Sequence, residues 1–181
     1  MNFGGIAHDW YKKNRRDLPW RKTRDPYLVW LSEVILQQTR VAQGLDYYNK
    51  FASAFPDLKS LAAAPEDQVL KLWQGLGYYS RARNMHAAAK ELVIKSEGKM
   101  PASYEGLLAM KGVGTYTAAA VASICFDEPK AVVDGNVSRV IARLYGVEEA
   151  VNGTAGMRII KELAGELMKE SLQLNQGISP G

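Results

Sequence analysis

A Gly-Val-Gly turn at residues 112–114 limits the possible folds of this chain more than any other stretch of its sequence. A short apolar segment, 104–110, precedes the turn, and an alanine-rich segment, 115–126, follows it. Both segments have helical spacing, and glycine permits the positive φ angles that a tight connection needs. Thr115 stands where the second helix needs an N-cap, so the N–H groups of its first turn could bind phosphate. The turn therefore predicts an αα-hairpin, and it leaves open whether the hairpin only packs or also binds an anion.

Helical spacing of apolar residues continues through most of the chain. The Asp25-Pro26 pair starts a helix that is apolar nearly all round and should be buried. Ile6, Trp10 and Tyr11 form a further helical stripe near the N-terminus, and residues 130–133 are expected to form a loop rather than a strand. With these included, the expected helices after the N-terminal stripe cover about 27–38, 41–55, 65–74, 79–95, 104–110, 115–126, 136–145 and 154–169. The predicted fold class is all-α.

Composition narrows the class of protein. The 181 residues carry 23 Lys and Arg against 19 Asp and Glu, a net charge of +4, which permits nucleic-acid binding without proving it. The single cysteine, Cys125, excludes an internal disulfide framework and fits a reducing intracellular setting. No apolar run approaches the roughly 18 residues that a membrane span needs. The polar, charged N-terminus does not have the pattern of a secretory signal.

Two acidic residues occupy positions that are typical of catalytic carboxyl groups. Glu33 lies among Trp30, Val34 and Ile35, and desolvation by such neighbours raises the pKa of a carboxyl group, which could then donate a proton near neutral pH. The alternative is a buried Glu33 that pairs with an arginine such as Arg21. Asp134 follows an apolar stretch after the hairpin and precedes a Gly-Asn pair and another helix.

Three motifs, together with the hairpin and the Asp134 segment, resemble the helix-hairpin-helix superfamily of DNA glycosylases, which includes endonuclease III. The motifs are Leu-Pro-Trp-Arg at 18–21, Trp-Leu-Ser-Glu-Val-Ile-Leu-Gln-Gln-Thr at 30–39 and Leu-Trp-Gln-Gly-Leu-Gly-Tyr-Tyr-Ser-Arg-Ala-Arg-Asn at 72–84. They match the adenine-specific branch of that superfamily, and the resemblance covers residues 5–178. It implies two helical lobes around a cleft, and removal of adenine mispaired with 8-oxoguanine or guanine from double-stranded DNA.

The resemblance also implies roles in catalysis. Glu33 would protonate the departing adenine, and Asp134 would stabilise the sugar cation by its charge or by a transient covalent bond, with both carboxyl groups facing one cleft. Tyr116 and Asn136 would position the sugar and the acid. Tyr116 stands where bifunctional relatives carry a lysine nucleophile, so hydrolysis without Schiff-base strand cleavage is expected.

The same resemblance implies contacts to DNA. The base must leave the duplex, and Gln38 and Tyr78 match positions that fill the gap in the stack. Core packing is the alternative for Tyr78 or its neighbour Tyr79. Trp20 and Arg21 would line the adenine pocket, whereas Trp30 is expected in the core. The remaining DNA-binding residues would be Thr39, Arg81, Arg83, Lys111, Gly112, Val113, Gly114, Thr115 and Arg139, with a solvated surface position as the alternative for each arginine.

The expected lobes are residues 20–125, with six helices that include the hairpin, and residues 1–19 with 126–181. The second lobe looks truncated, because relatives hold a 4Fe–4S cluster on four cysteines and recognise oxidised guanine through a further domain, and both would lie beyond residue 181. This chain is therefore expected to hold no cofactor and no metal. Cys125 is expected to be a core residue, and His8 and His86 are expected at the surface.

Two other functions compete with adenine removal. One is a related glycosylase that acts on thymine or oxidised pyrimidines, and the other is a catalytically weak module that only binds DNA. Tyr116 and the Gln-Gln-Thr run at 37–39 argue against the first, and the presence of both Glu33 and Asp134 argues against the second. The expected partner is double-stranded DNA with an adenine mispair, without an obligate protein partner. The expected location is the cytoplasm of a bacterium, near the nucleoid, or otherwise inside the cell.

Overall fold

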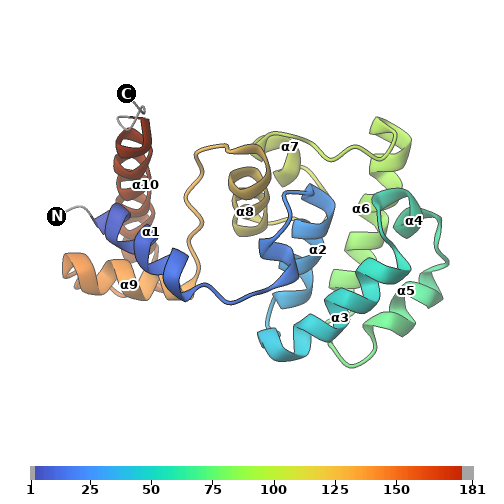
Figure 1. The fold of residues 1–181 in the computed structure, drawn as a ribbon. Coiled ribbons are helices and arrows are strands. Elements are labelled where there is room, and N and C mark those ends of the chain that lie inside the picture. The colour runs from blue at the N-terminus through green and yellow to red at the C-terminus, as the bar shows by residue number, and fades with distance from the viewer. Residues whose placement is uncertain (1–2, 177–181) are drawn as a thin grey trace. The chain divides into compact units, whose positions relative to one another are not determined.

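The computed structural model describes residues 3–176, and this part of the chain contains helices and loops but no strand (Figure 1). The all-α prediction is therefore confirmed. The chain divides into two units: Leu18–Glu128, here called the central unit, and the described parts of Met1–Asp17 and Pro129–Gly181, here called the terminal unit. The sequence had placed the boundaries at 20 and 125.

The central unit has seven α-helices, one more than expected. It begins with a 3₁₀ turn, η1, and continues through α2 to α8. The bounds are η1 Pro19–Arg21, α2 Pro26–Leu36, α3 Val41–Ala54, α4 Leu58–Ala63, α5 Glu66–Trp73, α6 Ser80–Ser96, α7 Tyr104–Leu108 and α8 Thr115–Phe126. The helix that the sequence analysis missed is α4, and the others lie within a few residues of their expected positions.

Helix α2 forms the centre of this unit. One carboxylate oxygen of Asp25 accepts hydrogen bonds from the backbone N–H groups of Tyr27 (2.8 Å) and Leu28 (3.2 Å), and Pro26 fits at the first position because no intrahelical donor is needed there. Seven of its eleven residues are buried, as the sequence predicted. The helix packs against α3 and α8, and Figure 1 shows α8 alongside it.

Helix α4 owes its start to a capping box. The Asp57 carboxylate accepts from the backbone N–H of Ser60 (2.7 Å), and the Asp57 N–H donates back to the Ser60 hydroxyl (3.2 Å). The helix has only six residues, so it presents less than two turns of apolar spacing to a sequence reading. Its buried residues Leu58 and Leu61 pack with α6.

Helix α6 buries Met85, Ala89 and Leu92, as expected, but it also buries His86, which the sequence analysis placed at the surface. His86 is 2% exposed, and its Nε2 donates to the carbonyl of Ala64 at 3.0 Å. That carbonyl belongs to the residue that ends α4. The histidine is tolerated inside because a helix terminus supplies it with an acceptor.

The terminal unit contains α1 Phe3–Asn14, α9 Gly135–Tyr145 and α10 Thr154–Gln176. Both α1 and α9 pack against α10, around a small core of Ile141, Ile160 and Ala164. Residues 130–133 form a loop, as expected. Ile6 and Trp10 on α1 are 58% and 65% exposed. None of the described helices is long and apolar enough to cross a membrane.

Candidate active site

The two glycines of the hairpin turn have different structural roles. Gly112 has a φ of +77°, and a Cβ added there would lie 2.6 Å from the Cβ of Asn84 on α6. Gly114 has an ordinary φ of −93°, and a Cβ added there would have no neighbour within 4 Å. The turn itself thus requires only the first glycine. The second leaves the backbone open on its outer side, where a partner could approach closely.

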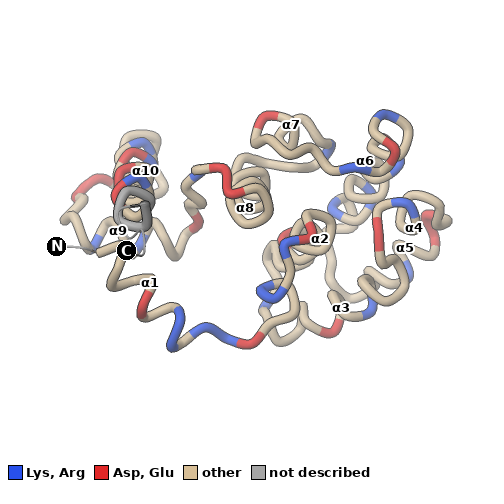
Figure 2. Tube along the Cα trace, turned by 45° about the horizontal axis from the view of Figure 1, so that its top comes forward, with Lys and Arg blue, Asp and Glu red and all other residues tan. Residues whose placement is uncertain are grey.

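The N-cap of α8 is Gly114, and Thr115 is the first residue of the helix, which corrects the expectation that Thr115 is the cap. Because glycine has no side chain, the first turn of α8 receives no side-chain cap. Val113 is buried at 8% exposure in the hydrophobic core of the central unit, whereas Lys111 is exposed. Helix α8 contains no charged residue and is drawn in tan in Figure 2, so none of its own side chains neutralises the partial positive charge at its amide end.

Gln38 and Tyr78 share an unusual backbone conformation and high exposure. Their φ angles are +59° and +45°, in the left-handed region that non-glycine residues rarely enter. Gln38 is exposed, Tyr78 is 66% exposed and its neighbour Tyr79 is 38% exposed. The structure therefore contradicts the core-packing alternative for both tyrosines. Left-handed non-glycine residues often occur at functional loops, where the surrounding structure holds the strain.

Arg81 is half-buried, and its guanidinium binds backbone carbonyls instead of occupying the solvated surface position that was the alternative; its contact with phosphate stays a prediction. Its Nη1 and Nη2 atoms donate to backbone carbonyls at the end of α2 and in the loop after α5. The accepting residues are Val34, Ile35, Gln37, Leu76 and Gly77. Its Nε is buried without a partner, and burial lowers the pKa of the guanidinium. The α2 carbonyls lack intrahelical donors, which explains why an arginine is drawn inward there.

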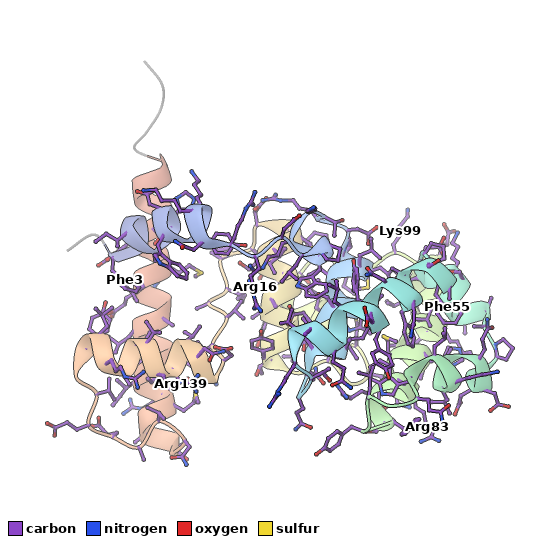
Figure 3. The ribbon with its side chains drawn as sticks, turned by 60° about the horizontal axis from the view of Figure 1, so that its bottom comes forward. Phe3, Arg16, Phe55, Arg83, Lys99 and Arg139 are labelled. Carbon is purple, nitrogen blue, oxygen red and sulfur yellow. The ribbon has the colours of Figure 1, made fainter. Side chains whose placement is uncertain are left out.

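The other two predicted DNA-contact arginines are exposed. Arg83, labelled in Figure 3, pairs with Glu66 at 3.2 Å, and both side chains are about half exposed. Arg139, labelled on α9 in the same view, donates to the side-chain oxygen of Asn136. Surface pairs of this kind are weak and exchange readily. The DNA contacts of Arg83 and Arg139 stay predictions.

Asp134 is the N-cap of α9. Its Oδ1 accepts from the backbone N–H groups of Asn136 (2.9 Å) and Val137 (2.7 Å), and its Oδ2 accepts from the Asn136 side-chain amide (2.9 Å). These bonds fix the orientation of the carboxylate at the start of the helix. Asp134 can therefore present a fixed negative charge.

In the central unit, the end of α2 contacts the first turns of α6 and α8. The carbonyl of Gln37, at the end of α2, accepts from Arg81, and the Gln37 side-chain amide donates to the Thr117 hydroxyl at 3.3 Å in the first turn of α8. Sequence analysis overlooked Gln37, although it stands beside Gln38. Glu33 is half-buried, one turn earlier on α2, and Tyr116 is 38% exposed at the start of α8. Asp134 and Asn136 belong to the terminal unit, so a cleft shared with Glu33 stays a prediction.

Trp20 and Arg21 lie at the start of the central unit. Trp20 is 9% exposed and its ring packs edge-on against Tyr48, with 5.1 Å between the ring centroids. Arg21 is exposed. Their role in an adenine pocket stays a prediction, whereas Trp30 is a core residue at 1% exposure, as expected.

Cys125 does not fit a role as an iron–sulfur ligand. A 4Fe–4S cluster needs four thiolates, and this sequence contains one cysteine. Burial raises the pKa of the half-buried Cys125 thiol to about 11, so it stays protonated. Among the described residues, no group of three or more His, Cys, Asp and Glu side chains could hold a metal ion.

Residues 31–166 match the family described as "HhH-GPD superfamily base excision DNA repair protein". The adenine DNA glycosylase of Mus musculus is 43% identical over 168 residues, which make up 88% of this chain and 33% of the mouse protein. The human adenine DNA glycosylase is 41% identical over 92% of this chain and 32% of its own length. That of Buchnera aphidicola from Acyrthosiphon pisum is 40% identical over 80% and 42%. This chain thus spans less than half the length of these relatives.

Two solved structures resemble the fold. A thermostable thymine-DNA glycosylase superposes with a TM-score of 0.79 and 27% identity, over 98% of this chain and 87% of the other. A trapped covalent intermediate of endonuclease III with DNA gives a TM-score of 0.74 at 19% identity, over 93% and 79%. The second likeness concerns the fold alone.

Proposed function

Because this chain belongs to the HhH-GPD superfamily of base excision DNA repair proteins, we propose that it removes adenine mispaired with 8-oxoguanine or guanine from double-stranded DNA. The observation that carries the proposal is its 40–43% identity to adenine DNA glycosylases of mouse, human and Buchnera over 80–92% of its length. Asp134, Glu33 and the hairpin lie inside the matched range 31–166.

The hairpin is the proposed grip on the DNA backbone. The open face of Gly114 and the uncapped first turn of α8 would offer N–H groups to one phosphate, and Lys111 would add a positive charge nearby. Such contacts hold the duplex in register without reading its sequence. The exposed Gln38 and Tyr78 side chains would then enter the base stack while the adenine leaves it.

The proposed reaction is hydrolysis of the bond between the sugar C1′ and adenine. Glu33 donates a proton to the adenine as that bond breaks, and the electron pair of the bond leaves with the base. The Asp134 carboxylate stabilises the positive charge that develops on the sugar, and water then adds to C1′ while its proton passes to the Glu33 carboxylate, which restores the acid. Tyr116 supplies no amine, so the product is an abasic site in an intact strand.

Asp134 suits its proposed role because its orientation is fixed before substrate arrives. Two backbone N–H groups and the Asn136 amide hold both carboxylate oxygens. A preorganised charge stabilises the transition state without reorganising during the reaction. Asn136 would therefore act by orienting Asp134, and Arg139 orients Asn136 in turn.

Two substitutions test the assignment of the carboxylates. Asp134→Asn keeps an efficient N-cap, so α9 should fold normally, and Glu33→Gln keeps the shape of the side chain. Each should slow single-turnover adenine release by at least about 100-fold while duplex affinity changes little. Arg24→Lys, on an exposed ion pair with Asp127, is the control and should release adenine at the wild-type rate. Wild-type rates in either carboxylate variant would contradict the mechanism.

A thymine-specific activity is the second candidate, because one solved neighbour with a TM-score of 0.79 is a thymine-DNA glycosylase. Its 27% identity is lower than the 40–43% shared with the adenine enzymes. Adenine release is therefore the favoured activity, and the two are separated by the base found in solution after incubation with each mismatch.

A further inference from the structure

One guanidinium connects the two loops that carry Gln38 and Tyr78. The Nη1 atom of Arg81 donates to carbonyls at the end of α2, and its Nη2 atom donates to carbonyls in the loop between α5 and α6. The acceptors of Nη1 are Val34 at 2.9 Å, Ile35 at 3.4 Å and Gln37, and those of Nη2 are Leu76 at 3.2 Å and Gly77 at 3.4 Å.

The two loop carbonyls in this set have particular positions in the chain. Gln37 directly precedes Gln38, and Gly77 directly precedes Tyr78. Each of these peptide groups sets the direction in which the next residue leaves the backbone. Gln38 and Tyr78 are also two of the four non-glycine residues with positive φ in the described chain. A conformation that is unfavourable by itself persists only where neighbouring contacts hold it.

A buried aromatic ring completes the connection. The Arg81 guanidinium lies 5.0 Å from the centroid of the Trp73 ring and 5.8 Å from that of Tyr78. Trp73 is fully buried, and its indole N–H donates to the same Gly77 carbonyl at 2.9 Å. Because a guanidinium is flat and has donors along its edges, it can stack on a ring and bind carbonyls on two sides at once. An ammonium group cannot do this.

We propose that Arg81 is a positioning residue that fixes the spacing between the Gln38 and Tyr78 loops. Arg81 does not touch DNA itself, and it promotes extrusion of the base only by holding these two loops in place. The inference rests on the proposed function. Two side chains can enter one base stack together only if their spacing matches the duplex. A preset spacing avoids the entropic cost of ordering both loops at that moment.

The test compares adenine that must be extruded with adenine that is already unstacked. The first duplex holds adenine opposite 8-oxoguanine, and the second holds the same adenine opposite an abasic site between two further mismatches. Arg81→Lys should lower kcat/KM on the first duplex by at least about tenfold and on the second by less than about threefold. Fluorescence of 2-aminopurine in place of adenine should show the same loss of unstacking in bound duplex. Arg24→Lys, which also loses an arginine with two hydrogen bonds (2.7 and 3.0 Å), should match wild type in both readouts.

A double-mutant cycle identifies the route of the effect. In a Gln38→Gly/Tyr78→Gly background, where both positive φ angles suit the residue and no side chain enters the stack, Arg81→Lys should cause no further loss. Equal losses on both duplexes, or a full further loss in that background, would overturn the proposal. The proposal would also be overturned if the slope of log affinity against log salt concentration became shallower in Arg81→Lys by the amount expected for one phosphate contact. Such a change would mark a direct contact between Arg81 and DNA.

A spectroscopic measurement on the wild-type chain covers the case in which Arg81→Lys does not fold. With ¹⁵N-labelled arginine, the Arg81 guanidinium protons should give resolved signals that keep their positions when undamaged duplex is added, whereas a phosphate contact would shift them. If wild type unstacks 2-aminopurine but releases no adenine, the proposed function fails and the positioning role stands. If wild type releases adenine and Arg81→Lys does not discriminate between the duplexes, the proposed function stands and the positioning role fails.

Discussion

His86 lies on the inner side of α6, where it is 2% exposed and donates one hydrogen bond to the carbonyl of Ala64 at 3.0 Å. Burial lowers the pKa of its imidazole below the ordinary 6.5, and the neighbouring charge of Lys90 lowers it further. The N–H of the neutral ring satisfies the Ala64 carbonyl, and no charge is placed in the core. At neutral pH, His86 therefore adds packing and one hydrogen bond to the junction of α4 and α6.

Acid should weaken this junction. Because the pKa of His86 is lower in the folded chain than in the unfolded chain, stability is complete above about pH 6.5 and falls as the unfolded state takes up the proton first. For a single group the decline cannot exceed about 1.4 kcal/mol per pH unit. Urea unfolding at pH 7.5 and 5.5 should show a smaller difference in His86→Gln than in wild type. His8→Gln, at an exposed position, is the control, and an unchanged difference in His86→Gln would refute the effect.

Two residues have surroundings that the sequence did not reveal, for different physical reasons. His86 stands in the run Met-His-Ala-Ala-Ala, where alanines suit either face of a helix, so the pattern does not reveal which side is buried. Arg81 faces inward because of carbonyls that come from two distant segments. By contrast, Trp30 and Met85 were placed correctly because large apolar side chains have strong reasons to be buried.

At the scale of elements, the two glycines of the hairpin have separate roles: one allows the turn conformation and the other keeps the backbone accessible. Gly112 supplies the positive φ and packs against Asn84, whereas Gly114 leaves the backbone open at the start of α8. The turn can therefore be damaged in two independent ways. A side chain at 112 would strain the fold, and a side chain at 114 would occupy the proposed phosphate position.

Matched substitutions should separate these roles. Gly112→Ala should cost about 1–3 kcal/mol of folding stability, because its φ is left-handed and its Cβ would meet that of Asn84. Gly114→Ser should leave stability within about 0.5 kcal/mol, because serine is a good N-cap in this conformation, but should weaken duplex binding by about tenfold or more. Unfolding curves and binding isotherms for both variants measure this. Unchanged affinity in Gly114→Ser would mean that the hairpin only packs.

Helix boundaries were predicted correctly where the local sequence signals were strong. Helix α2 begins at Asp25-Pro26, and α8 follows a glycine turn, so both starts could be predicted. Helix α4 was missed because its six residues offer only Leu58 and Leu61 as buried positions. Its capping box, Asp57 with Ser60, was the available signal. The cap of α8 was assigned to Thr115 instead of Gly114, since threonine is the commoner signal for a cap beside a glycine.

At the scale of the whole molecule, the proposed catalytic groups come from both units. Glu33 and Tyr116 belong to the central unit, and Asp134 and Asn136 belong to the terminal unit. Local patterns predicted that all four residues lie on or beside helices. The pairing of the two carboxylates in one reaction came from the resemblance to a family, because no spacing rule relates residues so far apart in sequence. That pairing is what a functional measurement has to test.

The most direct measurement identifies the free base released from four duplexes, which carry adenine opposite 8-oxoguanine, guanine or thymine, and thymine opposite guanine. We expect adenine from the first two, little from adenine opposite thymine, and no thymine from the fourth. The strands should stay intact until alkali cleaves the abasic sites. Release of thymine from the fourth duplex, or release of no base from any duplex by chain that binds DNA, would contradict the proposed function.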